Sequence, residues 1–193
     1  SEEEKTAAVR EIYGAHSDEV IEAFQKAYPG KDLSVLAKLD YWVRPGAVEF
    51  MTVRAKSGPQ APGYNYQFGL VFDINDGVPA WHCADIPFVF HNAARVPVAN
   101  IEGVTEQLEE EMAGSLIALA YTGNPNHKGM AKWMPFTAEG KETMVFDRRS
   151  ECRANVDTEL LEKIKAYGPA SGIMKVSVPK DVEEEESGID WLY

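Results

Sequence analysis

The chain contains too few strand-forming segments to build a sheet that could cover its own helices. Residues 64–68 alternate aromatic and polar side chains, residues 70–72 can extend them, and residues 142–146 form a second strand pattern. Apolar spacings of three and four instead predict helices along most of the chain, two within 3–28 and one each over 32–39, 44–58, 104–122 and 157–166. Two strands cannot cover several amphipathic helices. Either the helices pack on one another, or most of the sheet lies outside this chain.

The charge balance excludes several kinds of partner. The chain has 193 residues, with 19 Lys and Arg against 31 Asp and Glu, and a net charge of −12. Nucleic acids and anionic membranes both bind a basic face, so we expect neither as a partner. No apolar run approaches the ~20 residues that span a bilayer, and the first residues lack a signal-peptide pattern. We therefore expect a cytoplasmic protein, and the absence of an initial Met suggests processing or a longer parent.

The residues that could carry chemistry are few. Cys83 and Cys152 fit no metal-ligand spacing, so we expect free thiols and no metal or cofactor. His16 and His127 are expected at the surface. His82 differs, because it follows a strand in a loop, where sheet-based hydrolases place a general base. A structural role for His82 stays open on this ground alone, since the chain has no G-x-S-x-G nucleophile motif.

Residues 80–90, Ala-Trp-His-Cys-Ala-Asp-Ile-Pro-Phe-Val-Phe, resemble the catalytic-histidine segment of the type-B carboxylesterase/cholinesterase family. Four further landmarks of that family stand in the same order around it. They are the Tyr-x-Tyr-x-Phe strand at 64–68, the Thr-Gly-x-Pro-Asn helix end at 119–126, the Trp-x-Pro loop at 133–137 and the Thr-Met-x-Phe strand at 143–147. Tyr28-Pro29 and Asp40 match two upstream landmarks.

The resemblance implies the C-terminal portion of an α/β-hydrolase fold, helix-rich, with few strands of an incomplete sheet. The family uses a Ser-Glu-His triad in that chain order. His82 matches the triad histidine, which takes the serine proton and returns it to the leaving alcohol. Asp85 matches the acidic residue after the histidine, and we expect it to support the histidine loop. Asp147 and Asp157 are more simply explained as a strand end and a helix cap.

The family's oxyanion loop, nucleophile serine and triad Glu all precede the region that this chain matches. We therefore expect residues 1–167 to be a C-terminal segment of a carboxylesterase and residues 168–193 an acidic extension. Such a segment would be inactive alone, and its parent would hydrolyse small carboxylic esters through an acyl-enzyme. The alternative is a non-catalytic, cholinesterase-like binding or adhesion module. A third idea is that the chain pairs with a separate chain that carries the serine.

Two expectations concern surfaces. The strand at 64–68 should lack a neighbour on one side, and a homo-oligomer could cover that open edge. The helix over 104–122 carries one apolar stripe, which we expect to lie mostly in the core. The residues of that stripe are Leu108, Met112, Leu116, Leu119 and Ala120.

Overall fold

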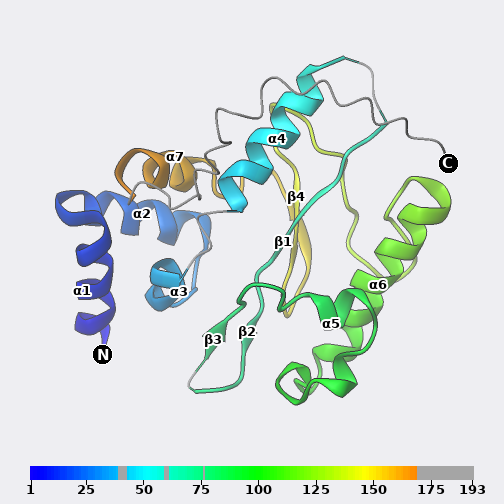
Figure 1. Ribbon diagram of the computed structural model, residues 1–193, viewed down its shortest axis with the longest axis horizontal. Helices are drawn as coiled ribbons and strands as arrows, with labels where there is room; N and C mark the ends of the chain where they lie inside the picture. Colours follow the sequence, from blue (N-terminus) through cyan, green and yellow to red (C-terminus); the bar gives the residue numbers. More distant parts are fainter. Residues whose placement is uncertain (39–42, 59–60, 76, 169–193) are drawn as a thin grey trace, which may run out of the picture.

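A three-stranded sheet lies at the centre of the computed structural model, which describes residues 1–38, 43–58, 61–75 and 77–168. The strand order is β1 (Asn65–Phe68), β4 (Thr143–Phe146) and β5 (Glu151–Arg153). β1 and β4 are parallel, with Asn65 opposite Thr143, and β5 is antiparallel to β4 (Figure 1). The two predicted strands are therefore confirmed, and they are direct neighbours.

A small second sheet follows β1 along the chain. It pairs β2 (Val71–Phe72) with β3 (Val78–Pro79) in antiparallel fashion. The prediction that residues 70–72 extend the first strand was wrong. The N–H of Gly69 still donates to the carbonyl of Phe146 at 2.8 Å, but the chain then leaves β4 and pairs with β3 instead.

Helices from the two ends of the described chain cover one face of the central sheet. They are α1 (Glu2–Tyr13), α2 (Ser17–Ala27), α3 (Leu33–Lys38) and α7 (Thr158–Tyr167), on the left in Figure 1. The hydrophobic core between these helices and the sheet includes Val145 of β4. Its other buried members are Val9, Tyr13, Val20, Ala23, Phe24, Ala27, Tyr28, Leu36, Val156, Leu160 and Ile164.

The interruption predicted between the first two helices is a 3-10 turn, η1 (Gly14–His16). Ser17 was expected to cap the second helix, or to stand next to its cap. It is instead the first residue of α2, and its hydroxyl donates to the carbonyl of Gly14. The N-terminus of α1 has the capping box, because the Ser1 side chain accepts from the N–H of Glu4 at 3.3 Å and Glu4 reaches back.

The opposite face of the sheet is covered by α5 (Ile86–Val89) and α6 (Thr105–Thr122), with the 3-10 turns η2 (Ala93–Arg95) and η3 (Pro97–Ala99) between them. Successive strand residues face opposite sides, so Met144 and Phe146 enter this second core while Val145 enters the first. Its other buried members are Leu70, Phe72, Ala84, Phe88, Ala93, Ala99, Ile101, Val104, Leu108, Met112 and Trp133. Helices on both faces of a parallel pair are typical of α/β proteins.

The remaining helix, α4 (Arg44–Lys56), lies across the top of Figure 1. None of its described residues is buried, and Phe50 and Val53 are 67% and 60% exposed. The two residues are three positions apart, so they lie on the same side of the helix.

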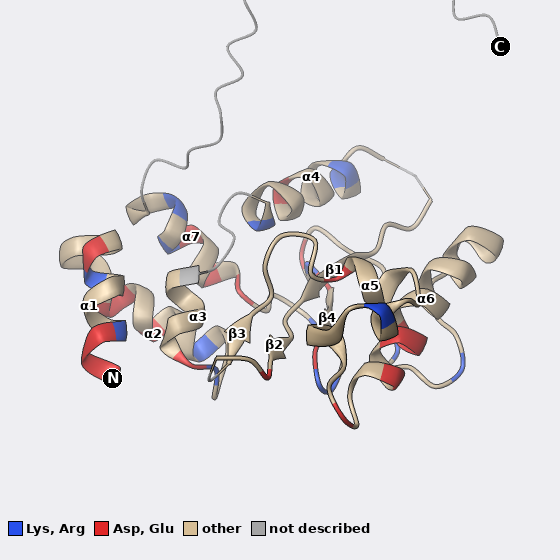
Figure 2. Cartoon of the chain, turned by 60° about the horizontal axis from the view of Figure 1, so that its bottom comes forward, with Lys and Arg blue, Asp and Glu red and all other residues tan. Residues whose placement is uncertain are grey.

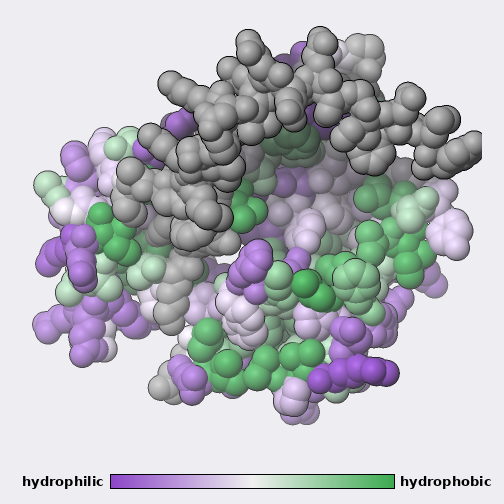
Figure 3. Space-filling view, viewed as in Figure 1, coloured by the Kyte–Doolittle hydropathy of each residue, from purple (hydrophilic) through white to green (hydrophobic). Residues whose placement is uncertain are grey.

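The apolar stripe of α6 is only half buried, which corrects the expectation that it lies in the core. Leu108 and Met112 are buried, but Leu116 and Leu119 are 45% and 39% exposed, and the neighbouring Ile117 is 58% exposed. The N-terminal half packs against the α5 segment, and apolar side chains gather over the α6 side at the right of Figure 3.

No described helix combines the length and apolarity needed to cross a bilayer. Figure 2 shows acidic residues at the start of α1 and around α6, with basic residues scattered between them. The first turn of α1 carries Glu2, Glu3 and Glu4, where the helix dipole favours negative charge.

Candidate active-site region

His82 lies in a tight turn that connects the β2–β3 sheet to α5. The N–H of Ala84 donates to the carbonyl of Trp81 at 3.0 Å, and the N–H of Ile86 donates to the carbonyl of Cys83 at 3.2 Å. Cys83 has a φ of 66°, which is uncommon for a residue with a side chain. The turn holds the side chain of His82 out toward solvent.

Asp85 ties this turn to the central sheet. Its Oδ2 accepts a hydrogen bond from the hydroxyl of Tyr66 on β1 at 2.7 Å. The Tyr66 ring packs edge-on against Trp133 and Phe146, with ring centroids 6.2 and 5.8 Å apart. Burial, followed by the nearby Asp85 carboxylate, raises the pKa of Tyr66 above its usual 10.0, so the hydroxyl stays a donor.

Packing fixes the residues on both sides of the turn. The Trp81 ring lies against Phe72, with centroids 4.6 Å apart, and the fully buried Phe88 of α5 lies 5.3 Å from the ring of Phe68. Beyond α5, the N–H of Ala93 donates to the buried carboxylate of Glu109 at 2.6 Å. The His82 backbone is therefore positioned by the sheet before it and by α6 after it.

The imidazole of His82 has no hydrogen-bond partner among the residues that the structure describes. It lines a cleft of about 560 Å³ together with Trp81, Cys83 and Asp85. The cleft is mostly apolar, and its far wall includes Tyr28 and Arg44. A histidine with both ring nitrogens open to a cleft can accept a proton from a group placed beside it.

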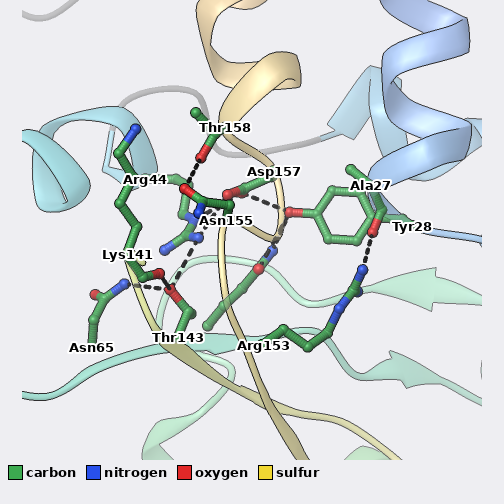
Figure 4. A network of polar contacts seen from close by, with 11 residues as sticks. Ala27, Tyr28, Arg44, Asn65, Lys141, Thr143, Arg153, Asn155, Asp157 and Thr158 are labelled. Atoms are coloured by element: carbon green, nitrogen blue, oxygen red, sulfur yellow. Dashed lines mark hydrogen bonds and ion pairs between the residues drawn. The ribbon is translucent and has the colours of Figure 1, made fainter. Parts of the chain in front are cut away.

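A buried polar network forms that far wall (Figure 4). The guanidinium of Arg44 donates twice to Asp157, from Nε to Oδ2 at 2.9 Å and from Nη2 to Oδ1 at 2.8 Å. The hydroxyl of Tyr28 donates to the same carboxylate at 2.8 Å and shares a hydrogen bond with Gln67 of β1. Burial and then Asp157 raise the pKa of Tyr28 above its usual value.

This network corrects the expectation that Asp157 is a helix cap. Asp157 occupies the N-cap position of α7, but its side chain makes no capping hydrogen bond and is 4% exposed. Its partner Arg44 lies 113 residues earlier in the sequence, so no local pattern indicates the pair. Asp147 follows β4 as expected and forms an ion pair with Lys31.

The other histidines are only partly as expected. His16 is exposed and stacks on Tyr167, with ring centroids 3.9 Å apart. His127 is half-buried rather than a free surface residue, because its Nε2 lies 3.2 Å from the carbonyl of Glu111 and its ring packs against Gly114 of α6. Both cysteines are free, and the described residues contain no cluster of His, Cys, Asp or Glu that could hold a metal.

Comparisons with known proteins identify the class of the fold. No family model and no curated protein matches the chain. Among solved structures, an esterase from anaerobic Clostridium hathewayi that can hydrolyze aliphatic aromatic polyesters has 38% identity and a TM-score of 0.80, over 86% of this chain and 33% of that one. The carboxylesterase Est55 of Geobacillus stearothermophilus has 24% identity and a TM-score of 0.59, over 84% of this chain and 35% of that one. A thermophilic PNB esterase has 25% identity and a TM-score of 0.56, over 85% of this chain and 33% of that one.

The chain thus has the fold of part of an α/β-hydrolase, helix-rich and with an incomplete sheet. More narrowly, its resemblance to type-B carboxylesterases is confirmed by neighbours that are PNB esterases and carboxylesterases. The chain spans about a third of the length of each of these proteins, which is consistent with a C-terminal segment.

Proposed function

We propose that this chain is the C-terminal part of a serine carboxylesterase and that His82 is the general base of its triad. One observation carries the proposal. The residue that matches the family's triad histidine lies on the wall of a cleft, its backbone fixed on both sides and its imidazole free for a partner from outside the described residues. A buried structural histidine would be hydrogen-bonded within its own fold, whereas His82 is exposed on the wall of the cleft.

The remaining groups of the reaction would come from the complementary two-thirds of the esterase. His82 takes the proton of the serine hydroxyl as the serine attacks the ester carbonyl, and then gives that proton to the leaving alcohol. It later deprotonates the water that releases the acid from the acyl-enzyme. A carboxylate from an earlier loop would hold the second imidazole nitrogen, as the family's chain order of serine, acid and histidine implies. Asp85 accepts from the hydroxyl of Tyr66 and so ties the histidine turn to β1. Asp85 therefore acts as a positioning residue.

The proposal predicts that the isolated chain is inactive. Without the serine, His82 has no nucleophile to activate, and ester hydrolysis should stay at the buffer rate. The chain should be assayed alone on a short-chain aryl ester such as p-nitrophenyl butyrate. Hydrolysis by the chain alone that disappears in His82→Ala would contradict the proposal.

The positive test supplies the missing part. The Clostridium hathewayi esterase, shortened by the third that this chain matches, is combined with this chain and assayed on the same ester. We expect hydrolysis that falls by at least ~10³-fold in His82→Ala and is unchanged in His16→Ala, which alters an exposed histidine outside the cleft. A complex that forms but shows no hydrolysis dependent on His82 would instead favour the binding module.

A further inference from the structure

Trp81 leaves nearly half of its surface exposed at the wall of the His82 cleft. Its exposed fraction is 47%, whereas Trp133, the other tryptophan that the structure describes, is 6% exposed and packs in the second core. Trp81 directly precedes His82 in the same tight turn, and both residues line the cleft. Their Cα atoms are therefore about 3.8 Å apart. A large aromatic surface thus lies next to the group proposed as the general base.

The Trp81 ring is held in place from behind. It lies against Phe72 of β2, which is 1% exposed, with ring centroids 4.6 Å apart and planes inclined by 36°. Backbone hydrogen bonds flank the residue, from the N–H of Ala80 to the carbonyl of Leu70 and from the N–H of Ala84 to the carbonyl of Trp81, both at 3.0 Å. The exposed part of the ring therefore lies on the side away from Phe72. A ring already fixed in this way loses little conformational freedom when a ligand binds it.

The part of the cleft beside Trp81 favours an uncharged, apolar ligand. Val71 of β2 pairs with Pro79 of β3, and both line the cleft just before the turn. The charged side chains that line the cleft already have partners, in the pairs Lys31 with Asp147, Arg44 with Asp157, and Asp85 with the hydroxyl of Tyr66. A charged ligand group beside Trp81 would lose its water without gaining a partner, whereas an apolar ring gains from burial.

We propose that Trp81 is a specificity-determining residue that stacks on an uncharged aromatic ring of the ester substrate. The ring lies over the exposed side of the indole, and the ester group next to it lies within reach of the serine that His82 activates. Aromatic pairs gain more than the burial of their area, because the face and the edge of each ring carry opposite partial charges. Trp81 therefore favours an aromatic ring over a saturated ring of the same size. The ester rests on the proposed function, whereas the stacking surface does not.

A protein surface is a poorer partner for the exposed side of Trp81. Trp81 and His82 are consecutive and line one cleft, so a surface packed on the indole would also restrict the access of an ester to His82. The core of a protein interface is a contiguous apolar area. The two exposed residues that follow Trp81 are instead His82 and Cys83. A small ring stacked on the indole needs no such area.

The kinetic test uses pairs of esters that differ only in their ring, with the complex of this chain and the shortened Clostridium hathewayi esterase. Benzyl acetate and cyclohexylmethyl acetate place the ring on the alcohol side. Methyl phenylacetate and methyl cyclohexylacetate place it on the acyl side. In Trp81→Leu, the ratio of kcat/KM for the aromatic ester to that for the saturated ester should fall about 2- to 10-fold in at least one pair. The pair that responds assigns the ring to the alcohol or to the acyl side.

Two control variants separate stacking from a general disturbance of the turn. Trp81→Phe keeps an aromatic ring and should keep most of the ratio. Tyr121→Leu removes an aromatic ring that is 87% exposed and outside the cleft, and it should leave the ratio unchanged. A displaced His82 lowers kcat/KM for both esters of a pair alike, so it does not change the ratio.

Binding is measured separately in the chain alone, by NMR of the indole N–H groups during titration with benzyl alcohol and with cyclohexylmethanol. Trp81→Leu identifies the Trp81 signal by its loss. We expect this signal to titrate with a Kd about 2- to 10-fold lower for benzyl alcohol, while the signal of the buried Trp133 stays in place.

Each other outcome decides against the proposal or separates it from the proposed function. An unchanged ratio in Trp81→Leu for both ester pairs, or a Trp81 signal that does not respond to benzyl alcohol, would overturn the stacking role. Weaker association of the two parts in Trp81→Leu, together with an unchanged ratio, would assign Trp81 to the contact between them. Stacking in the chain alone without hydrolysis dependent on His82 would leave the aromatic site standing and refute the catalytic role.

Discussion

Removing the guanidinium of Arg44 should destabilise the fold far more than removing an exposed cation. Arg44→Met keeps most of the aliphatic stem but leaves Asp157, 4% exposed, with only the hydroxyl of Tyr28 as a hydrogen-bond donor in the described network. Breaking one side of a buried ion pair costs about 3–5 kcal/mol, because the remaining charge stays buried without compensation. For a chain of this size, each kcal/mol lowers the melting temperature by about 2–4 °C, so Arg44→Met should melt about 6–20 °C lower.

The double variant Arg44→Met/Asp157→Leu separates the two causes of that loss. It removes both charges and should recover most of the stability, since an apolar pair often replaces a buried ion pair without loss. Asp157 makes no side-chain cap to α7, and the Tyr28 hydroxyl can still donate to Gln67 at 3.2 Å. Urea denaturation followed by circular dichroism gives the free energies of unfolding for the four members of the cycle.

The control is an ion pair at the surface. Arg148 pairs with Asp73, and their side chains are 45% and 63% exposed, so Arg148→Met should cost at most about 1 kcal/mol. The reasoning would fail if Arg44→Met cost no more than this control. It would also fail if the double variant were as unstable as the sum of its single changes, because the two charges would then be independent.

Three further predictions concern other parts of the chain. Lys5 holds the pKa of Asp32 at about 2, below its usual 3.8. Asp32→Asn should therefore lower the free energy of unfolding by less than about 1 kcal/mol at pH 7, and this cost should fade as the pH drops through about 2. Urea titrations at pH 7 and 2.5 would show the difference. Gly114→Ala should destabilise the fold by about 1–3 kcal/mol in the same assay, since its Cβ would lie 2.7 Å from the imidazole ring of His127. Gly46→Ala, with open space around it, should instead stabilise the fold by up to about 1 kcal/mol. Tyr66→Phe should lower kcat of the reconstituted esterase with little change in KM and cost about 1 kcal/mol of stability, and an unchanged kcat would contradict a positioning role.

Local patterns were sufficient for the long elements of this fold. Helices with three or more turns repeat their apolar spacing often enough to be recognised, and the predicted 104–122 helix agrees with α6 to within one residue. β3 and β5 have two or three residues each, too few to show a period of two, and both were missed. The residues of β2 were predicted as strand, but only as an extension of the strand at 64–68. Their positions depend on pairing with distant or neighbouring segments rather than on their own sequence.

The site shows the same division between local and long-range information. His82 and Asp85 were proposed from a contiguous motif, whereas the hydrogen bond from Tyr66 to Asp85 and the pair of Arg44 with Asp157 join separate elements. The exposed half of α6 also could not be predicted, because its stripe of apolar residues is the same whether or not another surface covers it. Fold class was accessible from the sequence, and the walls of the cleft were not.

Cys83, beside His82, offers a chemical handle on the cleft. Its thiol is exposed, whereas burial raises the pKa of the half-buried Cys152 and thereby lowers its thiolate fraction. A maleimide fluorophore added briefly near neutral pH should therefore attach first at Cys83. Emission from a dye at that position would shift as water leaves the cleft, so the arrival of an occupant could be followed in real time and titrated without any turnover.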